Sequence, residues 1–201
     1  MESVSILLSI FGRIPGIIVA ITIHYFICAA TATKLGDKLP KKEGRLTLNP
    51  LKHIEPMGFL MMLISMYGWG KPINTNSACY KDRRNGMMTV ALSGTVANFA
   101  AAILFGFGVK YMPSVNGVTA VFRVIMAYIV QYNLALGLFS LIPIYPLDGY
   151  KILMTLVKPS TYFKIVRYEK IVQMILMLLI FSGGLNFILG PIINILYQTC
   201  I

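Results

Sequence analysis

The chain has 201 residues, of which 57% are hydrophobic and 12% are charged, and its formal net charge is +11. Soluble domains carry about 25% charged residues and about 45–50% apolar ones. The composition therefore excludes an ordinary soluble domain and indicates that a lipid bilayer is the solvent. The length suits a single membrane domain over residues 1–201, with no room for a second globular domain.

Two features can explain the positive charge, namely a nucleic-acid partner or basic loops that set the topology of a membrane protein. The basic residues lie in short loops between apolar stretches, without a basic stripe or a base-stacking motif. Positive loops of this kind set membrane topology and attract anionic lipid. We therefore expect the lipid bilayer as a partner and no nucleic acid.

The first apolar stretch covers residues 4–32 and is long enough to cross a membrane. Pro15 and Gly16 interrupt it and mark a candidate start for the spanning helix. The loop that follows, residues 33–55, carries six basic residues against three acids. Such a loop is expected on the cytoplasmic side of the membrane.

A short apolar run at residues 57–69 is predicted to enter the membrane and return to the same side. The run has 13 residues, whereas a spanning helix needs about 20. The next loop, residues 70–86, is again basic, so both ends of the run are predicted to lie in the cytoplasm. A re-entrant hairpin needs its backbone packed against protein, and we expect this one to be buried.

Two further stretches, residues 87–109 and 118–141, are each long enough to span. Residues 143–170 form another basic loop before the last apolar stretch. The fold predicted from these patterns is an all-α membrane protein with about four transmembrane helices plus a short re-entrant hairpin. Its N-terminus is predicted to lie outside and its basic loops in the cytoplasm.

The last apolar stretch, residues 171–198, is interrupted at Ser182-Gly183-Gly184 and at Pro191. It is predicted to form one kinked span or two half-spans. Broken spans form binding sites in transporters, so a small transporter or channel is one functional alternative. Loose packing near the C-terminus is the plainer explanation.

Three potential metal ligands are predicted to meet at the cytoplasmic face. His24 and Cys28 are four residues apart and share one helix face, and Asp148 follows the 118–141 span on the same side. Imidazole, thiolate and carboxylate all bind zinc, and three protein ligands with one open position is the catalytic arrangement. Spacing alone also allows a carbonyl-bonded histidine, a buried cysteine and a turn aspartate, or a cysteine-protease pair.

Four segments carry a resemblance that covers about residues 15–155. They read TKLGDKLPKKEGRLTLNPLKHIEPMG (33–58), YGWGKPIN (67–74), ALSGTVAN (91–98) and NLALGLFSLIPIYPLDGYKIL (133–153). In order and spacing the chain resembles the short bacterial group of site-2 protease-type intramembrane zinc metalloproteases. The resemblance implies that family's membrane core and its activity, which is the cleavage of transmembrane segments in other membrane proteins.

The resemblance also implies one zinc ion, held in the family by an HExxH motif and by the aspartate of an LDG motif. The HExxH positions read HYFIC in this chain. His24 is the implied first ligand, Cys28 holds the position of the second, and Asp148 is the implied third. Tyr25 stands where the family has the glutamate that activates the zinc-bound water.

Two asparagines, Asn98 and Asn133, are the implied substrate-binding residues. Asn98 ends a segment that resembles the GPxxN motif of the family, except that Thr95 replaces the proline. Asn133 opens the segment that leads to the LDG motif, in which Ser140 replaces the asparagine of the usual FNL. The chain thus departs from the family at positions next to the implied site as well as in the HExxH motif.

The departures predict a catalytically impaired pseudoprotease. Cysteine is an acceptable zinc ligand, but an ordinary tyrosine has a pKa near about 10 and accepts no proton from water at neutral pH. The loss of one general base typically costs about 10²–10⁴-fold in rate. We therefore expect a protein of the cell membrane, with its site facing the cytoplasm, that binds transmembrane segments and cleaves them poorly.

The main alternative is an active intramembrane zinc protease with an altered His/Cys/Asp centre. In that case Asp148 or Glu55 would act as the base, and His53 would replace the lost histidine ligand. Glu55 and His53 lie together in the HIEP sequence of the first cytoplasmic loop. Chelator-sensitive cleavage with one bound zinc is the result that this alternative predicts.

Overall fold

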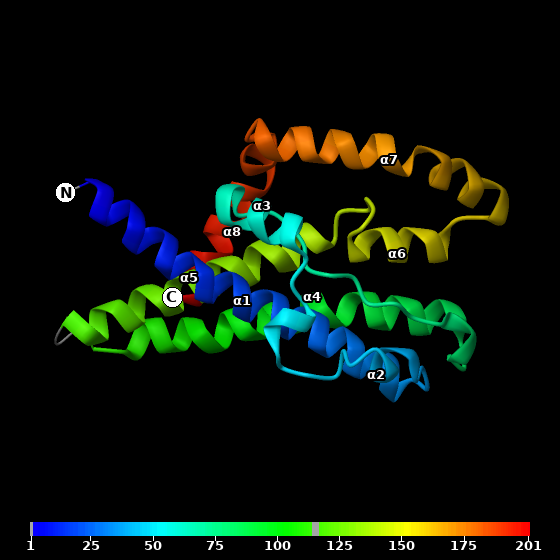
Figure 1. The fold of residues 1–201 in the computed structure, drawn as a ribbon, viewed down its shortest axis with the longest axis horizontal. Coiled ribbons are helices and arrows are strands. Elements are labelled where there is room, and N and C mark those ends of the chain that lie inside the picture. Colours follow the sequence, from blue (N-terminus) through cyan, green and yellow to red (C-terminus); the bar gives the residue numbers. More distant parts are fainter. Residues whose placement is uncertain (1, 114–116) are drawn as a thin grey trace.

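The computed structural model describes residues 2–113 and 117–201 (Figure 1). The described residues contain helices and no strand. The helices are α1 (Glu2–Lys34), α2 (Leu39–Lys42), α3 (Pro56–Ser65), α4 (Arg83–Tyr111), α5 (Gly117–Ser140), α6 (Asp148–Leu156), α7 (Pro159–Phe181) and α8 (Gly184–Cys200), with short 3₁₀ turns at Pro50–Lys52 and Ser77–Cys79. The prediction of an all-α membrane protein is confirmed.

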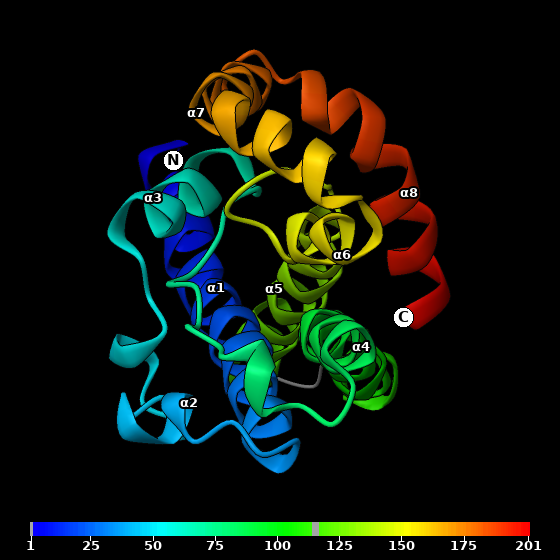
Figure 2. The same ribbon diagram turned by 90° about the vertical axis from the view of Figure 1, so that its right-hand side faces the viewer.

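Three described helices are long and apolar enough to cross a membrane, namely Phe11–Lys34 of α1, α4 and α5. The pair α7–α8 meets the same test as one broken span, bent by 68°. Three spans, or four when the bent pair is counted as one span, agree with the prediction of about four. Helices α1, α4 and α5 pack on one another as the centre of the molecule, and α6, α7 and α8 lie along one side of it (Figures 1 and 2).

Helix α1 is continuous through Pro15 and does not begin there. The glycines on either side of the proline allow α5 to pack closely on α1. A Cβ at Gly12 would lie 2.7 Å from the ring of Tyr128, and a Cβ at Gly16 would lie 2.9 Å from the carbonyl oxygen of Tyr128. Small residues let two membrane helices approach closely. The sequence feature that suggested a helix start is therefore a contact between α1 and α5.

The short apolar helix α3 turns back at once, as the hairpin prediction requires. It ends at Met66, whose φ of 73° lies in the left-handed region, and the chain then runs back as an extended segment over residues 66–76 (Figure 1). A Cβ at Gly58 would lie 2.0 Å from the carbonyl oxygen of Trp69. Glycine thus allows the returning segment to pack directly on α3, which buries the hairpin backbone.

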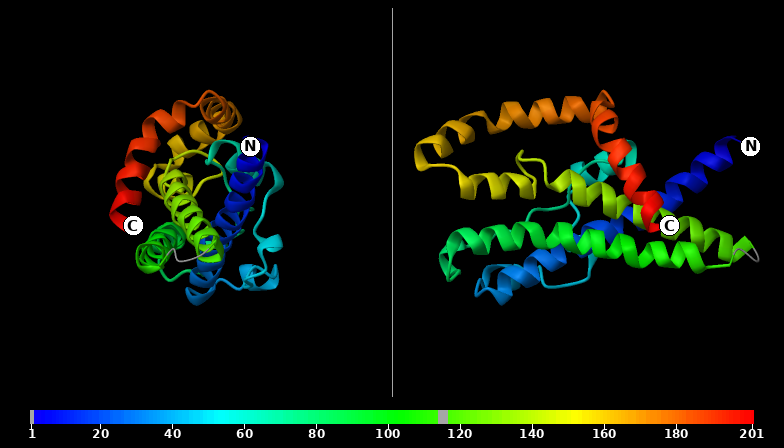
Figure 3. Two further views of the ribbon diagram at one scale, coloured as in Figure 1. Left: turned by 90° about the vertical axis from the view of Figure 1, so that its left-hand side faces the viewer. Right: turned by 180° about the vertical axis from the view of Figure 1, so that it is seen from behind.

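The region after α5 differs from the prediction. Residues 143–170 were expected to form a basic loop, but they contain α6 and the first half of α7, and Pro159 occupies the first turn of α7 where proline is favoured. The break in the last span lies at Ser182–Gly183, and Pro191 lies inside α8. Figure 3 shows how the chain turns at this bend, so that α8 leaves the direction of α7 and packs against α5.

Candidate metal centre

The three predicted ligands come together between α1 and α6. His24 and Cys28 project from adjacent turns of α1, and Asp148 is the first residue of α6. Their ligand atoms all lie within 4.8 Å of one another, and the three side chains are 0%, 1% and 3% exposed. The structure therefore brings Asp148 beside two residues that lie 124 and 120 positions earlier in the sequence, although the ligand roles themselves stay a prediction.

The tight turn between α5 and α6 determines where Asp148 lies. Gly149 packs so closely on the end of α5 that a Cβ would lie 2.1 Å from the carbonyl oxygen of Leu141. Only glycine allows this approach. The LDG sequence thus combines an aspartate with the glycine that lets α6 begin beside the end of α5.

Gly94 of α4 faces the cluster, and the space directly beside the ligand atoms is kept free of a side chain there. A Cβ at this position would lie 2.6 Å from Nε2 of His24 and 2.7 Å from Sγ of Cys28. Zinc binds imidazole nitrogen at about 2.0–2.1 Å and thiolate at about 2.3 Å. The donor set and this space fit a zinc ion held by His24, Cys28 and Asp148.

The carboxylate of Asp148 is engaged at both oxygens. Oδ2 lies 2.6 Å from Nε2 of His24, and Oδ1 accepts a hydrogen bond of 2.8 Å from Nζ of Lys151. Burial raises the pKa of the Asp148 carboxyl, but Lys151 and His24 outweigh burial and lower this pKa to about 2. A carboxylate in this state is a poor proton acceptor.

Lys151 is the residue of this centre that sequence reasoning missed. It lies three residues after Asp148 on the same face of α6, and its ammonium forms an ion pair with the carboxylate. The i,i+3 spacing of opposite charges was the available signal. Through this pair the buried aspartate is neutralised by protein groups alone.

The ring of Tyr25 contacts the ring of His24, with centroids 4.8 Å apart, and its hydroxyl reaches the extended segment after α3. Its hydroxyl accepts a hydrogen bond of 3.1 Å from the backbone N–H of Gly70, and a Cβ at Gly70 would lie 2.4 Å from the tyrosine ring. The side chain is 5% exposed. In the structure, the residue at the general-base position therefore anchors a neighbouring segment.

The two asparagines of the implied substrate site are fully buried. Neither the nitrogen nor the oxygen of the Asn98 side chain has a hydrogen-bond partner within residues 2–113 and 117–201. The Asn133 amide donates to the carbonyl of Ile129 at 2.8 Å, but its oxygen has no partner in the same part of the chain. Buried amides without partners are costly, which suits a role in binding a ligand, although that role stays a prediction.

Two positions at which the chain departs from the family motifs contact each other. The hydroxyl oxygens of Thr95 on α4 and Ser140 on α5 are 2.9 Å apart, and both residues are buried. Ser140 donates its own proton to the carbonyl of Gly137 at 2.9 Å, so Thr95 is the donor to Ser140. The replaced residues thus form a polar link between two spanning helices.

His53 and Glu55 do not join the cluster of His24, Cys28 and Asp148. Nε2 of His53 lies 2.7 Å from the carbonyl oxygen of Thr47, and burial lowers the pKa of His53. The carboxylate of Glu55 accepts a hydrogen bond of 2.6 Å from the N–H of Gly58 and caps α3. Both side chains have structural partners elsewhere, so the geometry gives no support to a replacement ligand or base from this loop.

Comparison with known proteins finds similar chains over most of this sequence. The protein named "Putative zinc metalloprotease YwhC" of Bacillus subtilis is 33% identical over 187 residues, which cover 89% of this chain and 84% of that protein. Proteins named "Putative zinc metalloprotease Rip2" are 28% identical over 180 residues in Mycolicibacterium smegmatis and 29% identical over 182 residues in Mycobacterium tuberculosis. Each of these two alignments covers 86% of this chain and 68% of the relative. No family model matches the chain, and no solved structure matches it.

Proposed function

Because the chain belongs to the site-2 protease-type family of intramembrane zinc metalloproteases, we propose that it acts as a pseudoprotease of that family. In this role it binds transmembrane segments of other membrane proteins and cleaves them poorly. The observation that carries the proposal is the hydrogen bond from Gly70 to the Tyr25 hydroxyl, because it engages the residue at the general-base position in packing.

Peptide hydrolysis needs a group that takes a proton from the attacking water. A zinc ion held by His24, Cys28 and Asp148 would supply Lewis-acid chemistry and a more acidic bound water. Tyr25 is a neutral phenol held by Gly70, and both oxygens of Asp148 are occupied. In the described part of the chain no further carboxylate joins the cluster, so metal binding without efficient proton transfer is the function that this arrangement supports.

We place the site at the cytoplasmic face of the cell membrane. Basic residues gather at the ends of α1 and α4 that lie beside the cluster, and positive loops mark the cytoplasmic side. These basic residues include Lys34, Lys38, Lys41, Lys42, Lys81, Arg83 and Arg84. A cysteine-accessibility experiment at Cys79, which is exposed, tests this orientation: labelling from the cytoplasmic side alone is expected.

Restoring the missing base is the direct test of impaired catalysis. Wild-type protein is purified with a single-span substrate in proteoliposomes and compared with Tyr25→Glu and with Tyr25→Glu/Cys28→His. We expect background cleavage by the wild type and a gain of about 10²–10⁴-fold in the variants. Tyr25→Phe is the matched control, because it also breaks the Gly70 contact but supplies no base, and it should gain nothing.

The cleavage rate of the wild type tests the proposal even if a variant folds poorly. Efficient cleavage by the wild type, abolished by Asp148→Ala, would contradict the proposal. That result would support an active protease with an altered His/Cys/Asp centre, which the approach of the three ligand atoms within 4.8 Å also favours. One equivalent of bound zinc together with chelator-sensitive cleavage is what this second candidate predicts.

A further inference from the structure

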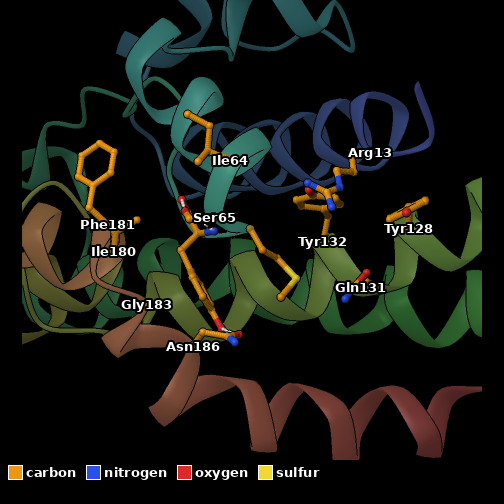
Figure 4. Close-up of a pocket in the computed structure, with 12 residues that line it drawn as sticks. Arg13, Ile64, Ser65, Tyr128, Gln131, Tyr132, Ile180, Phe181, Gly183 and Asn186 are labelled. Atoms are coloured by element: carbon orange, nitrogen blue, oxygen red, sulfur yellow. Dashed lines mark hydrogen bonds between the residues drawn. The ribbon is translucent and has the colours of Figure 1, made fainter. Parts of the chain in front are cut away.

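A cavity with both polar and apolar lining, called the polar cavity below for its polar side chains, lies between α1, α3, α5 and the bend of α7 and α8 (Figure 4). Its volume is about 420 Å³. The polar side chains that line it come from α1, α3, α5 and α8 and include Arg13, Ser65, Tyr128, Gln131, Tyr132 and Asn186. A set of polar groups at this density is unusual inside a membrane domain, where each one is costly unless it has a partner.

A second cavity of about 550 Å³ continues the first along α8. The two cavities share Met66, Gln131 and Asn186. On α8 the lining residues Asn186, Gly190, Asn194 and Gln198 follow one another at intervals of four and therefore form one face of the helix. The side of α8 next to α5 thus presents amides and space, where a helix that only packs would present apolar side chains.

Arg13 gives the cavity its charge. It is the one charged residue among the described residues that line the two cavities. A guanidinium has five N–H donors, and the hydrogen bond that the structure gives Arg13 is a long one of 3.3 Å to the carbonyl oxygen of Leu63. An arginine at membrane depth normally pairs with an acid, and this cavity supplies donors without an acid.

The depth of Arg13 separates it from both the metal centre and the membrane surface. It lies eleven residues before His24 on α1, or about 16 Å along the helix. Its neighbour Gly12 contacts Tyr128, which is eleven residues after the start of α5 at Gly117, again about 16 Å. Counted along the α5 span, Gly117–Ser140, this level is near the middle of a hydrocarbon core about 30 Å thick, and α1 continues outward from Arg13 to Glu2. Lipid phosphates lie beyond the edges of that core.

We infer that the cavity receives a transmembrane segment of a partner protein that carries an Asp or Glu near its middle, and that Arg13 pairs with this carboxylate. Charge complementarity carries the inference, because a half-buried cation within a membrane span and without an acid beside it calls for an anion at the same depth. The amides of Gln131 and Asn186 supply further hydrogen-bond donors along the lining of the same cavity. The cavity volumes admit side chains and not a whole helix, so the partner helix would pack against the opening. This inference rests on the proposed binding of transmembrane segments and specifies which segments are bound.

The test compares two synthetic single-span peptides of about 20 residues that are identical except for Asp or Leu at the central position. The full chain is placed in nanodiscs of phosphatidylcholine, and binding is measured by fluorescence energy transfer. We expect the Asp peptide to bind at least about tenfold more tightly, which corresponds to about 1.4 kcal/mol. Arg13→Gln should abolish the preference.

Two variants keep the result interpretable. Lys34→Gln makes the same charge change at the other end of α1, where the lysine is exposed and lines neither cavity, and it should keep the full preference. Arg13→Glu should prefer a peptide with a central Lys, which would show that a variant at this position still folds and binds. A preference for Asp that survives in Arg13→Gln would overturn the inference.

The remaining outcomes separate this inference from the proposed function. Equal binding of the Asp and Leu peptides by the wild type would overturn the inference and leave segment binding intact. Binding of neither peptide would overturn both. Loss of the preference on addition of phosphatidylglycerol, with Arg13-dependent binding of that lipid, would identify lipid phosphate as the occupant and would also overturn the inference.

Discussion

Helix α1 carries two polar regions, and they differ in how their charges are satisfied. At the metal centre, Asp148 contacts His24 and Lys151 at 2.6 Å and 2.8 Å. In the cavity eleven residues earlier on α1, the hydrogen bond that Arg13 makes among the described residues is a long one of 3.3 Å to the backbone carbonyl of Leu63. We call the first region closed, because the charge of Asp148 is matched by protein groups. We call the second region open, because no acid lies beside Arg13 among the described residues that line the cavities.

The difference indicates what each region is built for. A closed, hydrogen-bonded set orients its members without any outside partner, which suits a site that keeps its geometry even if catalysis is lost. An open cation leaves its binding free energy available for a ligand. Loss of one charged residue is therefore expected to destabilise the protein more at the metal centre than in the cavity around Arg13.

The largest expected effect comes from removing Asp148. Asp148→Ala leaves His24 and Lys151 without their anion, and breaking a buried pair in this way costs about 3–5 kcal/mol. Arg13→Met, by contrast, should cost less than about 1 kcal/mol, since it removes one long hydrogen bond. The free energy of unfolding in detergent, measured by titration with SDS, checks both values.

Asp82→Ala is the control for loss of a carboxylate at a helix N-terminus. Asp82 is exposed and caps α4, and its removal should cost about 1 kcal/mol. Asp148→Ala/Lys151→Met should recover part of the stability, because no unpaired cation remains. An equal loss in Asp148→Ala and Arg13→Met would contradict the distinction between a closed and an open region.

Gly94→Ala is expected to reduce stability less than Asp148→Ala does, but to weaken metal binding strongly. The new methyl group would occupy the space between His24 and Cys28, at 2.6 Å and 2.7 Å from their ligand atoms. Overpacking of this kind costs about 1–3 kcal/mol. We expect zinc affinity to fall at least about tenfold, measured as zinc per chain against a competing chelator.

Gly108→Ala provides the matched control on the same helix. There the Cβ would meet the flexible end of Met126 at 2.8 Å, a side chain that can move aside. Zinc content should remain that of the wild type. Wild-type zinc affinity in Gly94→Ala would show that the space beside Gly94 is not where the metal binds.

The sequence predicted the spanning helices and the ligand cluster for physical reasons. Apolar stretches of sufficient length have few alternatives to a membrane helix, and the helical period puts His24 and Cys28 on one face. Charge in the loops then placed Asp148 on the same side. Helix α6 and the first half of α7 are not predicted from the sequence, because the basic residues of 143–170 resemble those of a loop, although lysine and arginine are good helix formers.

The polar cavity was missed for a different reason. Its lining comes from α1, α3, α5, α7 and α8, so no single segment shows it. Two partial signals were present, namely Arg13 inside an apolar stretch and the spacing of Asn186, Asn194 and Gln198, which are eight and four residues apart and share one helix face. Each is weak alone, and only packing joins them into one region.

The smallest expected effect concerns the link between Thr95 and Ser140, which tests whether matched polar groups near the metal centre act as a unit. Thr95→Val and Ser140→Ala each remove one hydroxyl of the pair, and the double variant removes both. A buried hydrogen bond contributes about 0.5–1.5 kcal/mol, so a double-mutant cycle should show a coupling of about 1 kcal/mol between the two sites. Thr89→Val is the control, because its hydroxyl is exposed and bonds only within α4, and it should change stability by less than about 0.5 kcal/mol. Strictly additive losses would mean that these two replacements are independent, and that the closed character of this region comes from Asp148 and its partners alone.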